Sequence, residues 1–131
     1  MNMPRTFHEA KEALAAGTLT VVEMTRAALD AARKRAELNI FLELFDESAL
    51  AQAAKVDAKI ANGTAGPLAG AIISIKDNLC YKGHRVSASS RMLEGYVSPY
   101  SATAVERILA ADAVVIGRTN CDEFAMGSSN E

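Results

Sequence analysis

The apolar run at residues 71–75 is the feature of this 131-residue sequence that most limits its fold. The run follows a loop that Pro67 and Gly70 mark as a turn, and it stops at Lys76. Five nearly continuous apolar residues between turn signals are typical of a strand buried on both faces. The sequence therefore predicts a strand that other elements cover on both sides.

Lys76 ends this predicted strand and is the first candidate for chemistry. Burial disfavours the charged ammonium, so a lysine at this place can lose its proton near neutral pH and act as a base. Asp77 would prevent this by pairing with the ammonium, but successive strand residues point to opposite faces, so the two side chains need not meet. The alternative is a lysine that leaves the sheet and extends its amine into water.

The second half of the chain repeats the strand pattern. A helix is predicted after a cap at Ser101, with Val105 facing inward, and a second apolar run at 113–116 predicts another strand. A strand, a crossover helix and a strand form a βαβ unit, whose two strands run parallel. Chemistry in such sheets collects at the carboxyl ends of the strands, where Lys76 and the loop at 118–129 both lie.

The first 63 residues predict a helical arm. Thr6 with Glu9, and Thr20 with Glu23, have the spacing of a capping box that opens a helix. The elements expected here are helices at 6–17, 20–35 and 46–62, the last capped by Asp46, and a strand at 40–45.

The composition argues against several classes of function. The net charge is -2 and the longest basic run covers only 33–35, so we expect no nucleic-acid binding by this chain alone. No apolar stretch approaches the roughly 20 residues of a membrane span, and the first residues lack a signal-peptide core. Cys80 and Cys121 stand far apart, and His8 has no second ligand near it in the sequence. We therefore expect a cytoplasmic protein with reduced thiols, no membrane association and no metal site.

Three segments combine specific residues with specific spacing: 67–70 (PLAG), 76–78 (KDN) and 119–131 (TNCDEFAMGSSNE). Together they resemble the amino-terminal part of the amidase-signature enzymes, and the closing segment is most similar to the A subunits of the glutamyl-tRNA(Gln) amidotransferases in that family. Shorter matches lie at 82–83, 88–90, 93–94 and 102–107. Two positions differ from the family pattern, which often has proline where this chain has Ile72 and usually has glycine where it has Asp112.

The resemblance implies an α/β fold, in which the helical arm precedes a βαβ portion of a mixed sheet with helices on both faces. It also implies a Ser-Ser-Lys device, in which neutral Lys76 draws a proton through a bridging serine from a nucleophilic serine. That serine attacks the side-chain amide of glutamine and releases ammonia. In the family both serines and the oxyanion donors come later than Glu131, while Met126, Gly127 and Ser128 border the acyl site as substrate-binding residues.

The serines of this chain are not expected to replace that nucleophile. Ser89, Ser90, Ser128 and Ser129 lie in polar loops, without the strained strand-to-helix turn that exposes a nucleophilic serine. For each of these serines, a structural role in which the hydroxyl hydrogen-bonds the backbone of its own loop is at least as good an interpretation.

We therefore expect residues 1–131 to be an amino-terminal fragment of one amidase domain, with the helical arm at 1–63 and the start of the α/β core at 64–131. The resemblance implies B and C subunits as partners, glutamine as substrate, and tRNA bound only through the complex. It implies no cofactor in this chain and the use of ATP and Mg²⁺ by the partner subunit. The fragment alone is expected to be inactive. Two alternatives stay open, namely a fragment of another amidase-signature hydrolase of small amides and a non-catalytic binding module.

Overall fold

A computed structural model describes residues 3–128 of the chain. Its helices and strands, in chain order, are α1 (Phe7–Ala15), α2 (Val21–Lys34), β1 (Phe41–Leu44), α3 (Asp46–Ala61), β2 (Ile72–Lys76), α4 (Thr103–Ala110) and β3 (Val114–Thr119). Short 3-10 helices, η1 (Ala36–Leu38), η2 (Arg91–Leu93) and η3 (Glu123–Ala125), lie in the connections. This order of elements confirms the expected α/β class.

Helices α1 and α2 begin where the capping-box spacing predicts. At α2 both halves of the box form, because Thr20 Oγ1 accepts from Glu23 N at 3.1 Å and Glu23 Oε2 accepts from Thr20 N at 2.8 Å. At α1 Thr6 Oγ1 accepts from Glu9 N at 3.2 Å, whereas the Glu9 carboxylate accepts from Arg5 N. Each bond satisfies an N–H group that the helix itself leaves unpaired, and such a cap stabilises a helix by about 1 kcal/mol.

The caps predicted at Asp46 and Ser101 are wrong. Phe45 occupies the N-cap position of α3, and Asp46 is the first helical residue, where its carboxylate forms an ion pair with Arg33. Helix α4 has no side-chain cap, and the Ser101 hydroxyl accepts from Lys82 N at 2.9 Å. In both cases a partner distant in sequence engages the side chain that local spacing assigns to a cap.

The strands form one mixed sheet in the order β1-β3-β2. β2 and β3 pair in parallel, as the βαβ pattern predicts, with Ile72 opposite Val114 and Lys76 opposite Thr119. β1, the strand predicted at 40–45, pairs with β3 in the antiparallel sense. Part of the expected helical arm therefore belongs to the sheet.

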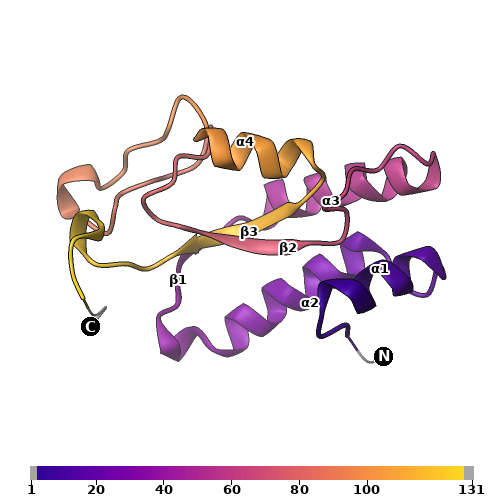
Figure 1. Ribbon diagram of the computed structural model, residues 1–131. Helices are drawn as coiled ribbons and strands as arrows, with labels where there is room; N and C mark the ends of the chain where they lie inside the picture. Colours follow the sequence, from indigo (N-terminus) through magenta and orange to yellow (C-terminus); the bar gives the residue numbers. More distant parts are fainter. Residues whose placement is uncertain (1–2, 129–131) are drawn as a thin grey trace.

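Helices cover both faces of the sheet, as the family resemblance implies (Figure 1). Helices α1, α2 and α3 pack on one face in a core that includes Val114 and Ile116 of β3, and α4 packs on the other face against Val115 and Ile75. In Figure 1, α4 lies above the strands, and α1 and α2 lie below them. The two cores follow from the alternation of the β3 side chains between the two faces.

An ion pair between buried Asp112 and half-exposed Lys59 holds the turn between α4 and β3. Asp112 has a left-handed backbone with φ of 71° and is 2% exposed. Its carboxylate accepts from Lys59 Nζ at 2.7 Å and from Gly66 N at 2.6 Å. Burial raises the pKa of Asp112, but the interactions with Lys59 and Gly66 outweigh it and hold the pKa below its ordinary value. An aspartate can therefore occupy a turn that otherwise favours glycine.

Three findings on the described residues concern membrane spans, metal ligands and thiols. None of its helices is long and apolar enough to cross a membrane. Residues 3–128 contain no group of three or more His, Cys, Asp or Glu side chains placed to hold a metal ion. Cys80 and Cys121 are free thiols, the first partly exposed and the second buried.

Candidate functional site

Lys76 is the last residue of β2, and its side chain is exposed. Within residues 3–128 β2 pairs only with β3, so its other edge is open. Ile75 is buried, whereas Ser74 and Lys76 are exposed. The strand is therefore only partly buried in the described chain, and the expected desolvation of the Lys76 amine is wrong there, since this side chain reaches water as in the alternative interpretation.

Asp77 is fully buried and pairs with Arg118 instead of Lys76. Its Oδ1 accepts from Arg118 Nη1 at 2.6 Å, and its Oδ2 accepts from Ser87 Oγ at 2.6 Å and from Ser89 N at 2.8 Å. Burial raises the pKa of Asp77, but the hydrogen bonds from Ser87, Ser89 and Arg118 outweigh it and lower the pKa below its ordinary value. The separation of Lys76 from Asp77 that strand alternation predicts is thus confirmed.

Arg118 connects all three strands at this end of the sheet. It lies on β3, and its Nε donates to Glu43 Oε2 of β1 at 3.1 Å while its Nη1 donates to Asp77, directly after β2. Its side chain is 11% exposed. Such charge-assisted hydrogen bonds are about twice as strong as neutral ones. Sequence reasoning missed this network because Glu43 and Arg118 are 75 residues apart.

The loop after β2 is held against the closing segment by its serines. Ser89 Oγ accepts from Cys121 N at 3.1 Å, and Ser90 Oγ donates to Glu123 Oε1 at 2.7 Å. Ala88 and Ser89 have left-handed φ values of 48° and 52°, a conformation that costs a residue with a side chain about 1 to 2 kcal/mol. The two hydroxyls therefore serve as long-range structural partners, although Ser90 also accepts from the local Met92 N at 3.2 Å.

Met126, Gly127 and Ser128 are exposed at the end of the described chain. Met126 is 84% exposed. Gly127 approaches Asp122 so closely that a Cβ would lie 2.6 Å from the carboxyl carbon, so a larger residue would require the Asp122 side chain to move. Ser129 falls outside the described residues.

Lys76 and the closing segment lie at the same end of the sheet (Figure 1). The parallel strands β2 and β3 both end there, with Lys76 opposite Thr119. Within residues 3–128, however, no hydrogen bond or ion pair joins Lys76 to 126–128. The expected site residues therefore share one end of the sheet but are not linked to one another by polar contacts in the described chain.

A cavity of about 320 Å³ with a mixed polar and apolar lining opens beside the Arg118 network. Arg118, Asn120 and Ser89 line it together with Arg85 and Arg91, which belong to the loop that follows β2. Lys76 does not line it. Guanidinium groups and hydroxyls at its wall can bind a polar group, and Glu94 at the same wall opposes a carboxylate.

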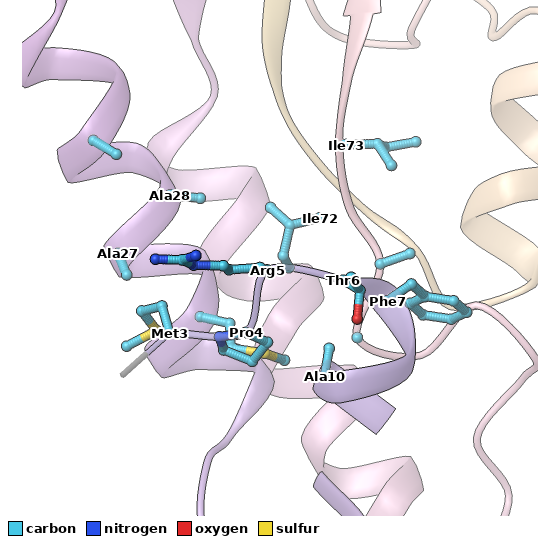
Figure 2. Close-up of a pocket in the computed structure, with 14 residues that line it drawn as sticks. Met3, Pro4, Arg5, Thr6, Phe7, Ala10, Ala27, Ala28, Ile72 and Ile73 are labelled. Atoms are coloured by element: carbon cyan, nitrogen blue, oxygen red, sulfur yellow. The ribbon is translucent and has the colours of Figure 1, made fainter. Parts of the chain in front are cut away.

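An apolar cavity of about 520 Å³ lies at the opposite end of β2 (Figure 2). Ala27 and Ala28 of α2, Ile72 of β2 and Phe7 of α1 line it, and Arg5 is the charged residue at its wall. This lining contains no side chain that accepts a proton near neutral pH. The candidate chemistry of the chain therefore lies at the Lys76 end of the sheet.

Comparison with known protein families supports one assignment. The family model described as Amidase matches residues 23–131. The A subunit of the glutamyl-tRNA(Gln) amidotransferase from Bordetella petrii is 52% identical to this chain over 123 residues. The matched segment is 94% of this chain and 24% of that protein. The chain thus spans about a quarter of the length of the curated relatives it matches.

Solved structures show the same similarity. An inhibitor-bound vestigial protein complex, described in connection with the origins of an s-triazine catabolic enzyme, has a TM-score of 0.87 and 30% identity, covering 93% of this chain and 27% of that chain. The native peptide amidase from Stenotrophomonas maltophilia has a TM-score of 0.84 and 32% identity, covering 96% of this chain and 27% of that chain.

Proposed function

This chain belongs to the amidase-signature family, and from that premise we propose that it forms the amino-terminal part of the glutamine-hydrolysing component of a glutamyl-tRNA(Gln) amidotransferase. The observation that carries this assignment is the 52% identity to the Bordetella petrii protein over 94% of the chain. The identity to the peptide amidase is 32% over a similar share. The sequence is thus closer to the tRNA-dependent enzyme than to that hydrolase of the same fold.

In this proposal Lys76 is the base of a Ser-Ser-Lys device whose two serines lie outside the 131 residues. Its place at the carboxyl end of a parallel strand supports this role, because α/β sheets gather their chemistry there. The engagement of Asp77 by Arg118 also supports it, since the neighbouring carboxylate is then not paired with the Lys76 amine. In this proposal the remaining length of the relatives covers the exposed end of β2 and excludes water from the amine.

A serine hydroxyl is a weak nucleophile until it loses its proton. The proposed reaction therefore needs a base within hydrogen-bond reach of the serine. The nucleophilic serine passes its proton through the bridging serine to Lys76 Nζ while its oxygen attacks the side-chain carbonyl of glutamine. The C–N bond then breaks, ammonia leaves with the returned proton, and water releases glutamate from the acyl-enzyme. Met126, Gly127 and Ser128 would border the acyl group, and their exposure leaves them accessible to it.

The partners follow from the same assignment. We infer that B and C subunits complete the complex, and that the B subunit uses ATP with Mg²⁺ to activate the glutamate on tRNA before ammonia reaches it. The net charge of -2 supports tRNA contact through the complex and not through this chain. Residues 3–128 offer no set of three acidic, His or Cys ligands for Mg²⁺, so no metal-dependent step is assigned to them. A role in tRNA charging implies a cytoplasmic location.

The decisive experiment uses the complete protein that contains this sequence, purified with and without B and C subunits. We expect it to release ammonia from glutamine and, in the complex, to convert Glu-tRNA(Gln) to Gln-tRNA(Gln) in the presence of ATP. Efficient hydrolysis of small amides without conversion of the tRNA would favour the alternative hydrolase. Absence of both activities in a folded complex would favour the binding module.

A further inference from the structure

Ser48 and His84 lie in hydrogen-bond contact although 36 residues separate them. Ser48 Oγ is 2.7 Å from His84 Nε2, and His84 Nδ1 is 3.0 Å from the carbonyl oxygen of Lys82. A carbonyl only accepts, so Nδ1 carries a proton, and the neutral imidazole then leaves Nε2 free to accept from the Ser48 hydroxyl. This is the tautomer in which an imidazole can act as general base for a serine.

Two aromatic rings hold the His84 imidazole in this orientation. It stacks on Tyr81 with ring centroids 3.9 Å apart and an interplanar angle of 12°, and it contacts Phe45 with centroids 4.4 Å apart. These two contacts restrict the rotation of the ring, and a base held in position favours general-base chemistry. The competing contact of the Ser48 hydroxyl, with Phe45 O, is longer at 3.4 Å.

The pair is accessible to a small molecule. Ser48 and His84 are both partly exposed, and both line an open cavity of about 590 Å³. Ser48 is the third residue of α3, whose first N–H groups have no acceptor within the helix and could receive an oxyanion. Glu43, Asp46 and Glu47 also line the cavity, so an anionic acyl group would be repelled.

We propose that Ser48 and His84 form a nucleophilic pair that takes acyl groups from neutral or cationic esters. Ser48 Oγ bonds to the ester carbonyl carbon while its proton moves to His84 Nε2. The bond from that carbon to the alcohol oxygen then breaks, and the alkoxide takes the proton from Nε2. Attack by water, through the same transfers, releases the acid and restores Ser48. This chemistry is independent of Lys76.

The test treats the 131-residue chain with p-nitrophenyl acetate and locates the acetyl group by peptide mass spectrometry. We expect acetylation of Ser48, with a rate that His84→Gln lowers by about a hundredfold or more, the typical contribution of a general base. His8→Gln is the matched control, because His8 is the other histidine of the chain and is exposed on α1. It should react like the unaltered chain.

A second ester and the position of the adduct keep the test decisive. An ester with a negatively charged acyl group, p-nitrophenyl hemisuccinate, should acylate Ser48 more slowly than p-nitrophenyl acetate does. The position of the adduct on the unaltered chain needs no variant, so it stands even where Ser48→Ala or His84→Gln unfolds. No adduct on Ser48, or equal acylation of Ser48 in a folded His84→Gln chain, would overturn the proposal.

Discussion

Lys76 and Asp77 are neighbours in sequence, yet one is exposed and the other is fully buried in an ion pair. If Lys76 is the base, Lys76→Ala in the complete protein should abolish glutamine hydrolysis, because loss of a general base costs about a hundredfold to ten-thousandfold in rate. Lys76→Arg should be nearly as damaging, since a guanidinium does not release its proton in a protein. Ammonia release from glutamine measures the effect.

Stability should change little in these variants, because Lys76 is exposed, and exposed substitutions alter the free energy of unfolding by about 0.5 kcal/mol or less. Lys82→Ala is the matched control, an exposed lysine in the loop after β2, and should keep full activity. Near-normal ammonia release by Lys76→Ala would remove Lys76 from the mechanism.

Asp77 makes a second prediction at this scale. Asp77→Asn should lower the free energy of unfolding by about 2 to 3 kcal/mol at pH 7, because it leaves the buried Arg118 with Glu43 as its remaining carboxylate. The folded-state pKa of Asp77 lies below its ordinary value of 3.8, so its stabilising contribution is complete above about pH 4 and is lost as the pH falls through the folded-state pKa.

The difference between Asp77→Asn and the unaltered chain should therefore shrink in acid. Urea unfolding at pH 7 and at pH 3 or below measures it. Asp30→Asn, which changes an exposed carboxylate paired with Arg33, is the control and should have little effect at either pH. A difference that stays constant between these pH values would contradict the role assigned to the ion pair.

At the scale of elements, the turn before β3 depends on Asp112. Asp112→Ala should lower the free energy of unfolding by about 2 kcal/mol, since it removes the acceptor of Gly66 N and the partner of the half-exposed Lys59, and alanine tolerates the left-handed conformation less well than aspartate does. Asp112→Gly loses the same ion pair without the backbone strain, so it should be about 1 kcal/mol less damaging than Asp112→Ala. Urea unfolding of the three chains at pH 7 gives the comparison. Equal losses in both variants would mean that the left-handed turn carries no strain.

Local patterns predicted most of these elements, because caps and apolar periodicity act within one turn of a helix or one strand. Thr20 with Glu23 marked the start of α2, and the two apolar runs marked a parallel pair. Contacts between distant residues could not be predicted in this way. Asp46 pairs with Arg33 and does not cap α3, and nothing near Arg118 in the sequence indicates Glu43 as its partner.

The predicted burial of β2 was wrong for the same reason, because it depends on contacts between segments distant in sequence. Its apolar run is typical of a central strand, but position in a sheet depends on which strands pair beside it, and the described chain supplies a partner on one edge only. Lys76 was found as a candidate through a family resemblance and its place after a strand. The Ser48–His84 contact was missed, because its residues belong to segments 36 positions apart with no shared motif.

At the scale of the whole molecule, we expect the 131-residue chain to have no glutaminase activity by itself. Loss of the nucleophile from a serine device costs about a millionfold in kcat, and the proposed serines lie outside this chain. The assay is glutamine hydrolysis by the purified chain beside its Lys76→Ala variant. Turnover that the variant loses would mean that a serine within the chain, such as Ser128 or Ser129, is the nucleophile.

Exposed apolar side chains give a second expectation for the same sample. Leu38, Ile40 and Leu42 are between 41% and 54% exposed around β1, and the edge of β2 is open within the described residues. Open strand edges and apolar patches favour association. The isolated chain should therefore bind a dye such as ANS or self-associate, which fluorescence and light scattering would detect. A monomer that binds no dye would show that these surfaces are covered in solution.

The ion pairs of Arg118 join the two halves of the chain, and this limits which hybrids of two related genes keep them. Glu43 comes from the first half of the chain, while Asp77 and Arg118 come from the second. Recombination between two related genes near residue 63 would join a Glu43 from one parent to an Asp77 and Arg118 from the other. Such hybrids keep both ion pairs only where the first parent supplies Glu43 and the second supplies Asp77 and Arg118, so a hybrid that lacks one of the three leaves a charge unpaired at this end of the sheet.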